Sequence, residues 1–244
     1  MKYACYISLL VSMMPLSVNS QQVEAGLQTG IGTFSMTELK RLNEIVMQDI
    51  PFDTRIVTDF PVYFYYRPFI MLKVNNISIG PMYTYQSTGS RVSAKDYSGE
   101  YRFDIIINSS SPGILAETGL FNPGKIQCSF YSAFGILFSN LKLKEHLKVQ
   151  EENLLDYFFR YKTLNMFFEP GLKFTYPLNF LNIGLNAGYL IQVGNKSFHA
   201  PGNKDALLVN PESEVPVKPG WNGVRVGLSV YRCFNLTSKK PAGN

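Results

Sequence analysis

The feature that most constrains this chain is a strict alternation of apolar and polar residues, which recurs in eight separate segments. The pattern is clearest in the last segment, residues 220–234, with the sequence GWNGVRVGLSVYRCF. Its apolar positions are Val224, Val226, Leu228 and Val230. The intervening positions carry glycines, Arg225, Ser229 and two aromatic residues. Because successive side chains of a strand point to opposite faces, each segment predicts a β-strand with one apolar and one polar face.

The spacing of these segments predicts how the strands are connected. The expected strands span residues 23–34, 62–74, 77–88, 100–119, 125–138, 164–176, 181–192 and 220–234. The connections alternate long and short, and the long ones cover residues 35–61, 89–99, 140–163 and 194–219. Outer-membrane barrels combine an even number of antiparallel strands with short periplasmic turns and longer external loops. We therefore expect an all-β fold, an eight-stranded antiparallel up-and-down transmembrane β-barrel with both chain ends on the periplasmic side.

Two local features interrupt this plan. Ser35 and Glu38 have the spacing of a capping box, and helical spacing follows them, so a short helix is expected in the first long connection. The residues with that spacing are Leu39, Leu42, Ile45 and Val46. In the fourth strand, the stretch from Ser109 to Gly113 contains a proline and predicts a β-bulge, because proline cannot donate a hydrogen bond to a neighbouring strand.

The composition of the two strand faces distinguishes a membrane barrel from a soluble, lipocalin-like barrel. The polar faces carry mainly Gly, Ser, Thr, Asn and Gln with few charges, whereas a face in water would carry more Lys and Glu. The apolar faces are rich in Phe, Leu, Ile and Tyr, and the chain contains 18 Phe and 15 Tyr. About nine such residues suffice for a tilted strand to cross a bilayer. We therefore expect the apolar faces to meet lipid and the polar faces to fill a narrow interior.

Residues 1–20 have the features of a secretory leader: Lys2, an apolar stretch to Leu16, and small residues at Val18 and Ser20. The expected organisation is a signal peptide at 1–20, an outer-membrane barrel at 21–236 and a C-terminal tail at 237–244. The protein would then be exported and reside in the outer membrane. Its excess of basic residues is scattered along the chain, so no nucleic-acid partner is expected.

Charged residues on the inward faces predict a polar network inside the barrel. A barrel of eight strands is just wide enough for side chains to fill it, and desolvated charges need partners. Glu169 is expected to pair with Arg67 or Arg225, in a structural network; a polar conduit is the alternative. The full expected set is Glu24, Arg67, Lys73, Arg102, Asp104, Glu169, Lys173 and Arg225.

The long connections contain both histidines, His146 and His199, near Ser197, Asp205 and Glu145. A hydrolase would need a histidine together with a serine and a carboxylate, but the spacing matches no hydrolase motif. The cysteines and histidines lack metal-ligand spacing, and the glycines form no phosphate-binding loop. We therefore expect a non-enzymatic protein with no catalytic residue, metal or cofactor.

The rim of the third strand and the loop after it have the sequence STGSRVSAKDYSGEYRFD, residues 87–104. Its charged residues could clamp one another in an ordered external turn, or they could bind lipopolysaccharide phosphates at the outer leaflet. The residues concerned are Arg91, Lys95, Asp96 and Glu100.

Several stretches resemble the small outer-membrane β-barrel families of Gram-negative bacteria, in particular the PorT-like barrels of the Bacteroidetes lineage. They are the leader ending at Ser20, the STGSR and DYSGEYRFD stretches, FFEPGLKFTYPL at 167–178, and the closing segment 220–234. The resemblance implies an assembly signal that the barrel-insertion machinery would recognise, with Trp221, Val230 and the terminal aromatic Phe234. The tail after Asn235 departs from the family, in which many barrels end on that aromatic residue.

Three functional hypotheses follow. The first is a structural or surface-binding barrel that acts through its external loops, with outer-membrane lipid, lipopolysaccharide and a surface or periplasmic protein as candidate partners. The second, implied by the resemblance, is an accessory barrel of a protein secretion system. The third is a membrane-embedded lipid hydrolase that uses a loop histidine. A general pore is not expected at this strand count.

Overall fold

The computed structural model describes residues 21–49, 55–95, 97, 99–149 and 152–236. The expected signal peptide at 1–20 and the tail at 237–244 lie outside these residues. The described chain forms one helix, α2 (Thr37–Asp49), and nine strands. The strands are β1 (Gln21–Gly32), β2 (Arg55–Asp59), β3 (Tyr63–Val74), β4 (Ile77–Lys95), β5 (Gly99–Phe121), β6 (Gln127–Val149), β7 (Glu152–Pro177), β8 (Asn182–Val193) and β9 (Gly223–Asn235).

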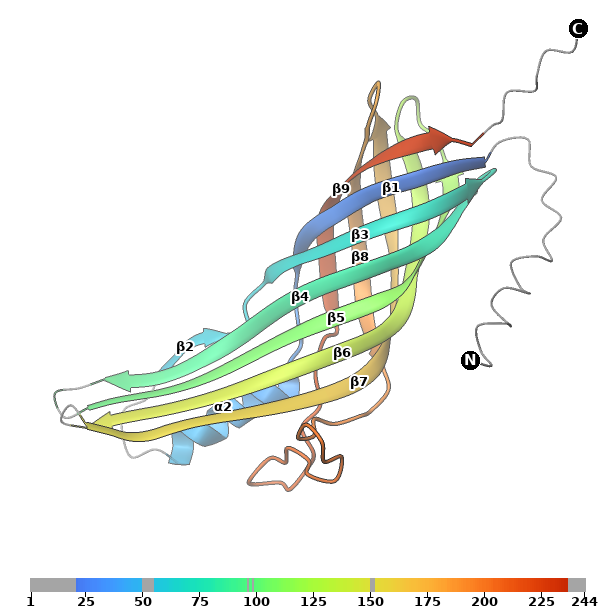
Figure 1. The fold of residues 1–244 in the computed structure, drawn as a ribbon. Helices are drawn as coiled ribbons and strands as arrows, with labels where there is room; N and C mark the ends of the chain where they lie inside the picture. Colours follow the sequence, from blue (N-terminus) through green and yellow to red (C-terminus); the bar gives the residue numbers. More distant parts are fainter. Residues whose placement is uncertain (1–20, 50–54, 96, 98, 150–151, 237–244) are drawn as a thin grey trace, which may run out of the picture.

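Eight of the nine strands close into a ring (Figure 1). The pairing order runs β4-β3-β1-β9-β8-β7-β6-β5, and β5 pairs with β4 to complete it. Every pairing is antiparallel, and the C-terminal strand β9 lies between β1 and β8. The prediction of an eight-stranded antiparallel up-and-down barrel is therefore confirmed. The ninth strand, β2, lies outside the ring and pairs with the far end of β4.

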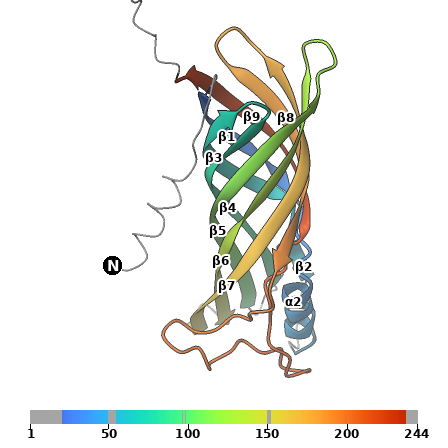
Figure 2. The same cartoon turned by 90° about the vertical axis from the view of Figure 1, so that its right-hand side faces the viewer.

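The strands of the ring differ greatly in length. β1, β3, β8 and β9 have 12 or 13 residues, whereas β4 to β7 have between 19 and 26. The four long strands continue beyond the ring as a curved sheet. This sheet lies at the end of the ring opposite to the start of β1 and the end of β9 (Figures 1 and 2). We call this sheet the extension; it comprises residues 87–95, 99–108, 140–149 and 152–163.

The structure corrects three sequence-based expectations. The connections expected at 89–99 and 140–163 are largely strand, because β4 runs to Lys95 and β5 begins at Gly99, while β6 runs to Val149 and β7 begins at Glu152. The stretch from Ser109 to Gly113 pairs with β4 without a register shift, so the expected bulge is absent there. A shift between β5 and β6 occurs instead between Gly119 and Phe121. Asn75 and Asn76 form the tight turn between β3 and β4, and Asn75 adopts a positive φ of 55° in it.

The strands β5 and β6 keep their alternation but exchange polarity where they leave the ring. On β6, Phe134, Ile136 and Phe138 point outward within the ring and are exposed. Beyond Phe138 the outward positions carry Asn140, Lys142 and Lys144, while the inward residues Leu141 and Leu143 are buried. The pairing of β6 with β5 and β7 continues through this point in unchanged register. The side chains therefore face the same way throughout, and what changes is the polarity of the residues at the outward and inward positions.

The inner face of the extension is apolar because α2 and the connection between β8 and β9 cover it. Leu39 and Leu42 of α2 belong to the same buried cluster as Ile105 and Leu141 of the extension. The expected helix is thus confirmed, and Ser90 Oγ of β4 donates a 3.2 Å hydrogen bond to Asn43 Oδ1 of α2. The hydroxyl of Ser35 donates to the carbonyl of Gly220 at 3.0 Å and so ties the start of the helix to the β8–β9 connection.

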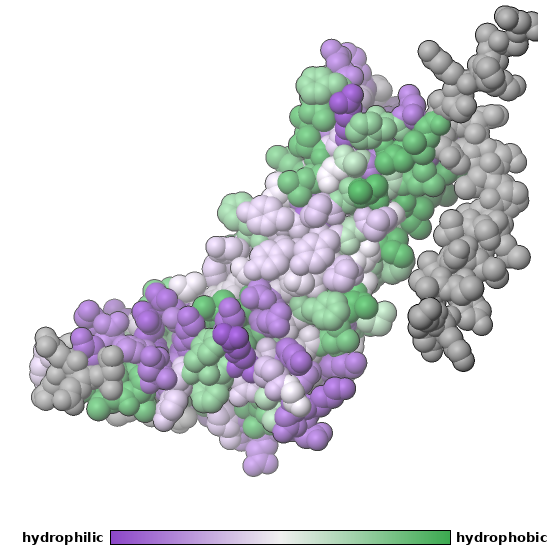
Figure 3. Space-filling view, viewed as in Figure 1, coloured by the Kyte–Doolittle hydropathy of each residue, from purple (hydrophilic) through white to green (hydrophobic). Residues whose placement is uncertain are grey.

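Exposed apolar side chains surround the ring, and polar ones gather toward the far end of the extension (Figure 3). The exposed residues include Leu27 and Ile31 of β1, Ile70 of β3, and the alternate positions of β9 from Val224 to Val230. Among the described residues, no helix has the length and hydropathy needed to cross a membrane.

Candidate functional site

The centre of the barrel holds a fully buried carboxylate between two guanidinium groups. Glu169 of β7 accepts hydrogen bonds from Arg67 of β3 at 3.0 and 2.5 Å, and from Arg225 of β9 at 2.7 Å. The structure therefore joins Glu169 to both of the arginines that the sequence offered as alternative partners. Tyr131 of β6 donates a further hydrogen bond to Glu169 at 3.2 Å.

Polar side chains from three more positions support the two arginines. Arg67 donates from Nε to Thr84 Oγ1 at 2.9 Å, and from Nη1 to Gln28 Oε1 at 3.4 Å. Arg225 donates to Gln86 Oε1, but its own Nε makes no hydrogen bond with the described residues. The central cluster, defined as Gln28, Arg67, Thr84, Gln86, Tyr131, Glu169 and Arg225, thereby links six strands across the lumen.

A second polar layer lies toward the end of the barrel where β1 starts. Lys173 of β7 forms a 2.8 Å ion pair with Glu117 of β5, and its Nζ lies 4.1 Å from the centroid of the Tyr231 ring. Beyond it, Lys73 lies 3.6 Å from Glu24. Lys173, Lys73 and Glu24 were expected inside the barrel and each has a partner there, as desolvated charges require. The sequence analysis did not identify Glu117 as an interior residue.

A third, mainly apolar layer closes the other end. Trp221 is fully buried, donates from Nε1 to Ser139 Oγ at 2.8 Å, and packs edge-on against Phe34 at 5.1 Å between centroids. Between this layer and the Lys173 layer, a void of about 10 Å³ remains beside Tyr131. That volume corresponds to about one water molecule. The arrangement of the three layers gives a packed lumen, which suits a structural element better than a conduit.

Two residues expected in this network lie elsewhere. Arg102 and Asp104 of β5 point outward on the extension, and the inward positions are Tyr101, Phe103 and Ile105, which are buried. The expectation was wrong because it assigned the apolar face to lipid along the whole strand. In the extension the inner face packs against α2, so the apolar residues turn inward and the charged residues lie on the outer face, where Arg91 and Arg102 cover Asp104.

The stretch at 87–104 forms a charged hairpin of β4 and β5. Arg91 donates to Asp104 at 2.6 Å, and Arg102 lies 3.6 Å from the same carboxylate. These hydrogen bonds raise the pKa of Arg91 above its usual value. Lys95 and Glu100 form an exposed pair at 3.3 Å, and the fourth expected residue, Asp96, lies outside the described residues. Of the expected clamp, the pair of Lys95 and Glu100 is therefore present, whereas Arg91 pairs with Asp104 instead. The binding of lipopolysaccharide phosphates stays a prediction.

Next to that hairpin, the outer face of β6 and β7 carries a basic group that the sequence analysis missed. Lys142 of β6 lies directly opposite Arg160 of β7, and Asn140 lies opposite Lys162. Arg160 and Lys144 both lie against the ring of Phe158, at 4.7 and 5.8 Å from its centroid. The signal was present as the alternation LKLKEHLKV at 141–149, but this stretch was expected to be a loop.

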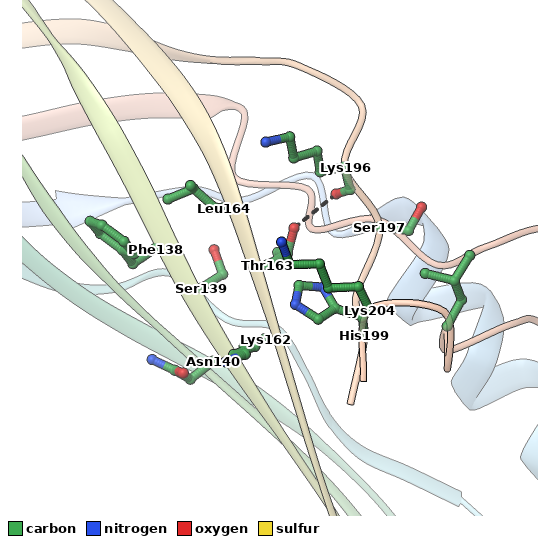
Figure 4. Close-up of a pocket in the computed structure, with 11 residues that line it drawn as sticks. Phe138, Ser139, Asn140, Lys162, Thr163, Leu164, Lys196, Ser197, His199 and Lys204 are labelled. Atoms are coloured by element: carbon green, nitrogen blue, oxygen red, sulfur yellow. Dashed lines mark hydrogen bonds between the residues drawn. The ribbon is translucent and has the colours of Figure 1, made fainter. Parts of the chain in front are cut away.

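A cavity of about 610 Å³ lies beside this basic group, between β6–β7 and the β8–β9 connection (Figure 4). Lysines 162, 196 and 204 line it together with His199, and Phe138, Leu164 and Leu207 contribute apolar surface. The β8–β9 connection is held to β7 through paired backbone hydrogen bonds of 2.9 and 3.0 Å between Lys162 and His199. Thr163 Oγ1 also donates to the carbonyl of Lys196 at 3.0 Å.

One of the two histidines lies where the sequence predicted it, and the other does not. His146 lies within β6, not in a connection, whereas His199 lies in the β8–β9 connection as expected. Ser197 and His199 both line the cavity, but no hydrogen bond between their side chains or with Asp205 occurs in the described structure. Glu145 instead accepts a 3.1 Å hydrogen bond from Tyr101, and burial together with this carboxylate raises the pKa of Tyr101. The described residues contain no group of three or more side chains suited to a metal ion.

The residues of the expected assembly signal lie in two environments. Val230 and Phe234 point outward from β9 and are exposed, with Arg232 stacked 5.3 Å from the Phe234 ring centroid. Trp221 precedes β9, which begins at Gly223, and is buried in the third layer of the lumen. Trp221 is thus part of the packed interior and not of the closing strand.

No protein-family model and no curated protein matches the sequence. Among solved structures, the chain is similar to Ail, the attachment invasion locus protein of Yersinia pestis, in its complex with the heparin analogue sucrose octasulfate. The identity is 10%, the match covers 88% of this chain and 99% of Ail, and the TM-score is 0.41. Neisserial surface protein A matches at 11% identity over 88% and 97% of the two chains, with a TM-score of 0.35. The translocator domain of the autotransporter NalP from Neisseria meningitidis matches at 11% identity over 95% and 96%, with a TM-score of 0.34. Similarity at this level does not establish a relationship, and the proposals below depend on the chain's own residues.

Proposed function

We propose that this protein is a non-enzymatic outer-membrane barrel whose ring spans the bilayer and whose extension projects from the cell surface as a rigid binding platform. The observation that carries the proposal is the exchange of polarity along β5 and β6 without a change of register where they leave the ring. A soluble barrel gives a strand no reason to invert its faces partway along. A strand that passes from lipid into water, and there packs its inner face against α2, requires this inversion.

The packed lumen and the extension favour surface binding over the other hypotheses. Three layers of side chains fill the ring, so transport through it is not supported. An accessory role in secretion, which the resemblance to PorT-like barrels implies, would use the end with the chain termini. That end carries short turns at 75–76, 122–126 and 178–181, whereas the extension offers a helix and long paired strands. We therefore place surface binding first.

Labelling of single cysteines tests the membrane position. In a background with Cys128→Ala and Cys233→Ala, Lys144→Cys and Phe134→Cys introduce thiols on the same outward face of β6. On intact cells, a membrane-impermeant maleimide should label the thiol at position 144 and leave that at position 134 unlabelled until the protein is denatured. Equal labelling of both positions, in a protein that fractionates as soluble, would contradict the proposal. Co-purification of secretion components that is lost on deletion of residues 237–244 would favour the accessory role.

A further inference from the structure

We propose that the cavity between β6–β7 and the β8–β9 connection binds an anionic amphiphile, with its phosphate head group among Lys162, Lys196 and Lys204 and its acyl chain against Phe138, Leu164 and Leu207. The inference rests on the proposed membrane position of the barrel and names a ligand class for one part of its surface. Three independent features of the cavity carry it.

The first feature is the charge of the lining. Lys162, Lys196 and Lys204 all line the cavity, and no Asp or Glu of the described residues is among its lining. Within the described part of the chain, none of these three lysines forms an ion pair, whereas Lys40, Lys73, Lys95 and Lys173 each have a carboxylate partner. Three ammonium groups around one cavity repel one another unless an anion lies between them. Lysine binds phosphate well as a compact point charge.

The second feature is the apolar side of the same cavity. Phe138 and Leu164 lie directly opposite each other on β6 and β7, and both are exposed outward. Leu207 of the β8–β9 connection contributes a third exposed apolar side chain. A free inorganic anion would make no favourable contact with these apolar side chains. A volume of about 610 Å³ lies within the range of pockets that enclose small amphipathic ligands.

The third feature is the position of the cavity on the molecule. Phe138 and Leu164 form the last apolar pair of the outward face, and the next outward pair is Asn140 and Lys162. The cavity therefore spans the row at which the strands pass from apolar to polar surroundings. An amphiphile in the outer leaflet would present its phosphate and the start of its acyl chain at this level. Lys142 and Arg160, opposite each other without a carboxylate between them, extend the positive surface beyond the cavity.

The cavity is also held open by structure around it. Lys196 is fixed through its backbone, since its N–H donates to Asn165 Oδ1 at 3.1 Å and its carbonyl accepts from Asn165 Nδ2 at 3.2 Å. Phe198, two residues later, is fully buried in the core of the extension. A site that is organised before the ligand arrives loses less entropy on binding.

Binding of dodecyl phosphate to the detergent-solubilised, full-length protein tests the proposal. The triple variant Lys162→Gln, Lys196→Gln, Lys204→Gln should lose at least about tenfold in affinity. A matched control, Lys125→Gln, Lys239→Gln, Lys240→Gln, makes the same change in net charge and should bind as the wild type does. Leu207→Gln should weaken dodecyl phosphate binding and leave any binding of inorganic phosphate unchanged.

Each alternative result overturns a defined part of the proposal. Equal affinity of the wild type and the triple variant would exclude the cavity as the site. Inorganic phosphate that binds as tightly as dodecyl phosphate would indicate a free-anion site, and dodecyl maltoside that competes equally would indicate a site for apolar chains alone. Insertion is measured separately by the shift of the unboiled band on a gel. If the wild-type protein fails to insert, the proposed function is contradicted. If it inserts normally but does not bind dodecyl phosphate selectively, only this inference is contradicted.

Discussion

At the scale of single residues, the central cluster shows how a narrow barrel accommodates charge. Glu169 is fully buried, and so are the two arginines that donate to it. Taking charges out of water is costly, and the mutual attraction of the three groups offsets that cost only while all are present. The cluster is therefore sensitive to loss of its carboxylate, because two guanidinium groups would then face each other without compensation.

Replacement of Glu169 by Gln should reduce the free energy of unfolding by about 3–5 kcal/mol, the usual effect of removing one partner of a buried ion pair. Urea titration of the refolded protein in detergent, followed by the mobility of the unboiled band, measures it. The control is Glu100→Gln, which breaks an exposed pair and should cost less than about 1 kcal/mol. The triple change of Arg67, Glu169 and Arg225 to Met should be less harmful than the single change; a worse result would show that the charges themselves stabilise the barrel.

Two glycines provide the space that Tyr131 needs to reach Glu169. A Cβ at Gly188 would lie 2.3 Å from the Tyr131 hydroxyl oxygen, and one at Gly171 would lie 2.4 Å from its ring. Both glycines face the lumen on neighbouring strands. A crowded interior thus explains why glycine occupies these two inward positions. The contact between a Cβ at Gly188 and the Tyr131 hydroxyl oxygen allows a direct test of this crowding.

Gly188→Ala should destabilise the barrel by about 1–3 kcal/mol, as overpacking usually does. Tyr131→Phe removes the oxygen that the new methyl group would meet. Gly188→Ala should therefore cost less stability in the Tyr131→Phe background than it does in the wild type. The same urea titration, applied to the wild type and three variants, gives the coupling between the two sites. Additive effects would show that the methyl group collides with the backbone of Pro170 instead, whose carbonyl lies 2.9 Å from it.

At the scale of elements, the sequence predicted the strands of the ring well and the extension poorly. Alternation identifies a strand wherever its two faces meet different media, as β3 and β9 do over their whole length. It does not reveal where the medium changes, so Arg102 and Asp104 were assigned to the interior. β2 was missed because its side chains are mostly exposed on both faces and show no alternation. The basic lining of the cavity was beyond prediction, because the β8–β9 connection meets β7 only in the folded chain.

The contact between α2 and the extension can be disrupted without touching the ring. Leu39 is fully buried in the core of the extension, whereas Arg41 on the same helix is exposed. Leu39→Asn should release α2 and make the extension sensitive to protease, while the unboiled band of the ring still shifts on the gel. Arg41→Asn is the matched control and should resist protease as the wild type does. Loss of the gel shift in Leu39→Asn would show that the ring depends on the extension for its stability.

At the scale of the whole molecule, the fold joins a closed ring, which has no free strand edge, to an open sheet. The ring satisfies the hydrogen bonds of its backbone internally, as a membrane requires. The open edges of the extension are covered at least in part, by β2 on β4 and by the β8–β9 connection on β7. In the proposed membrane position, this arrangement would present a large ordered surface outside the membrane while the part within the membrane stays small.

The ring should not conduct ions, because its three lumen layers obstruct the same path one after another. The wild type in a planar bilayer should show no stable conductance steps, in contrast to a porin inserted in the same way. Trp221→Ala should remain silent as well, since the central cluster and the Lys173–Glu117 layer still fill the lumen below it. Steady steps from the wild type would contradict the packed lumen. Steps from Trp221→Ala alone would show that Trp221 is the seal and that the polar layers beneath it admit water and ions, as the conduit hypothesis requires.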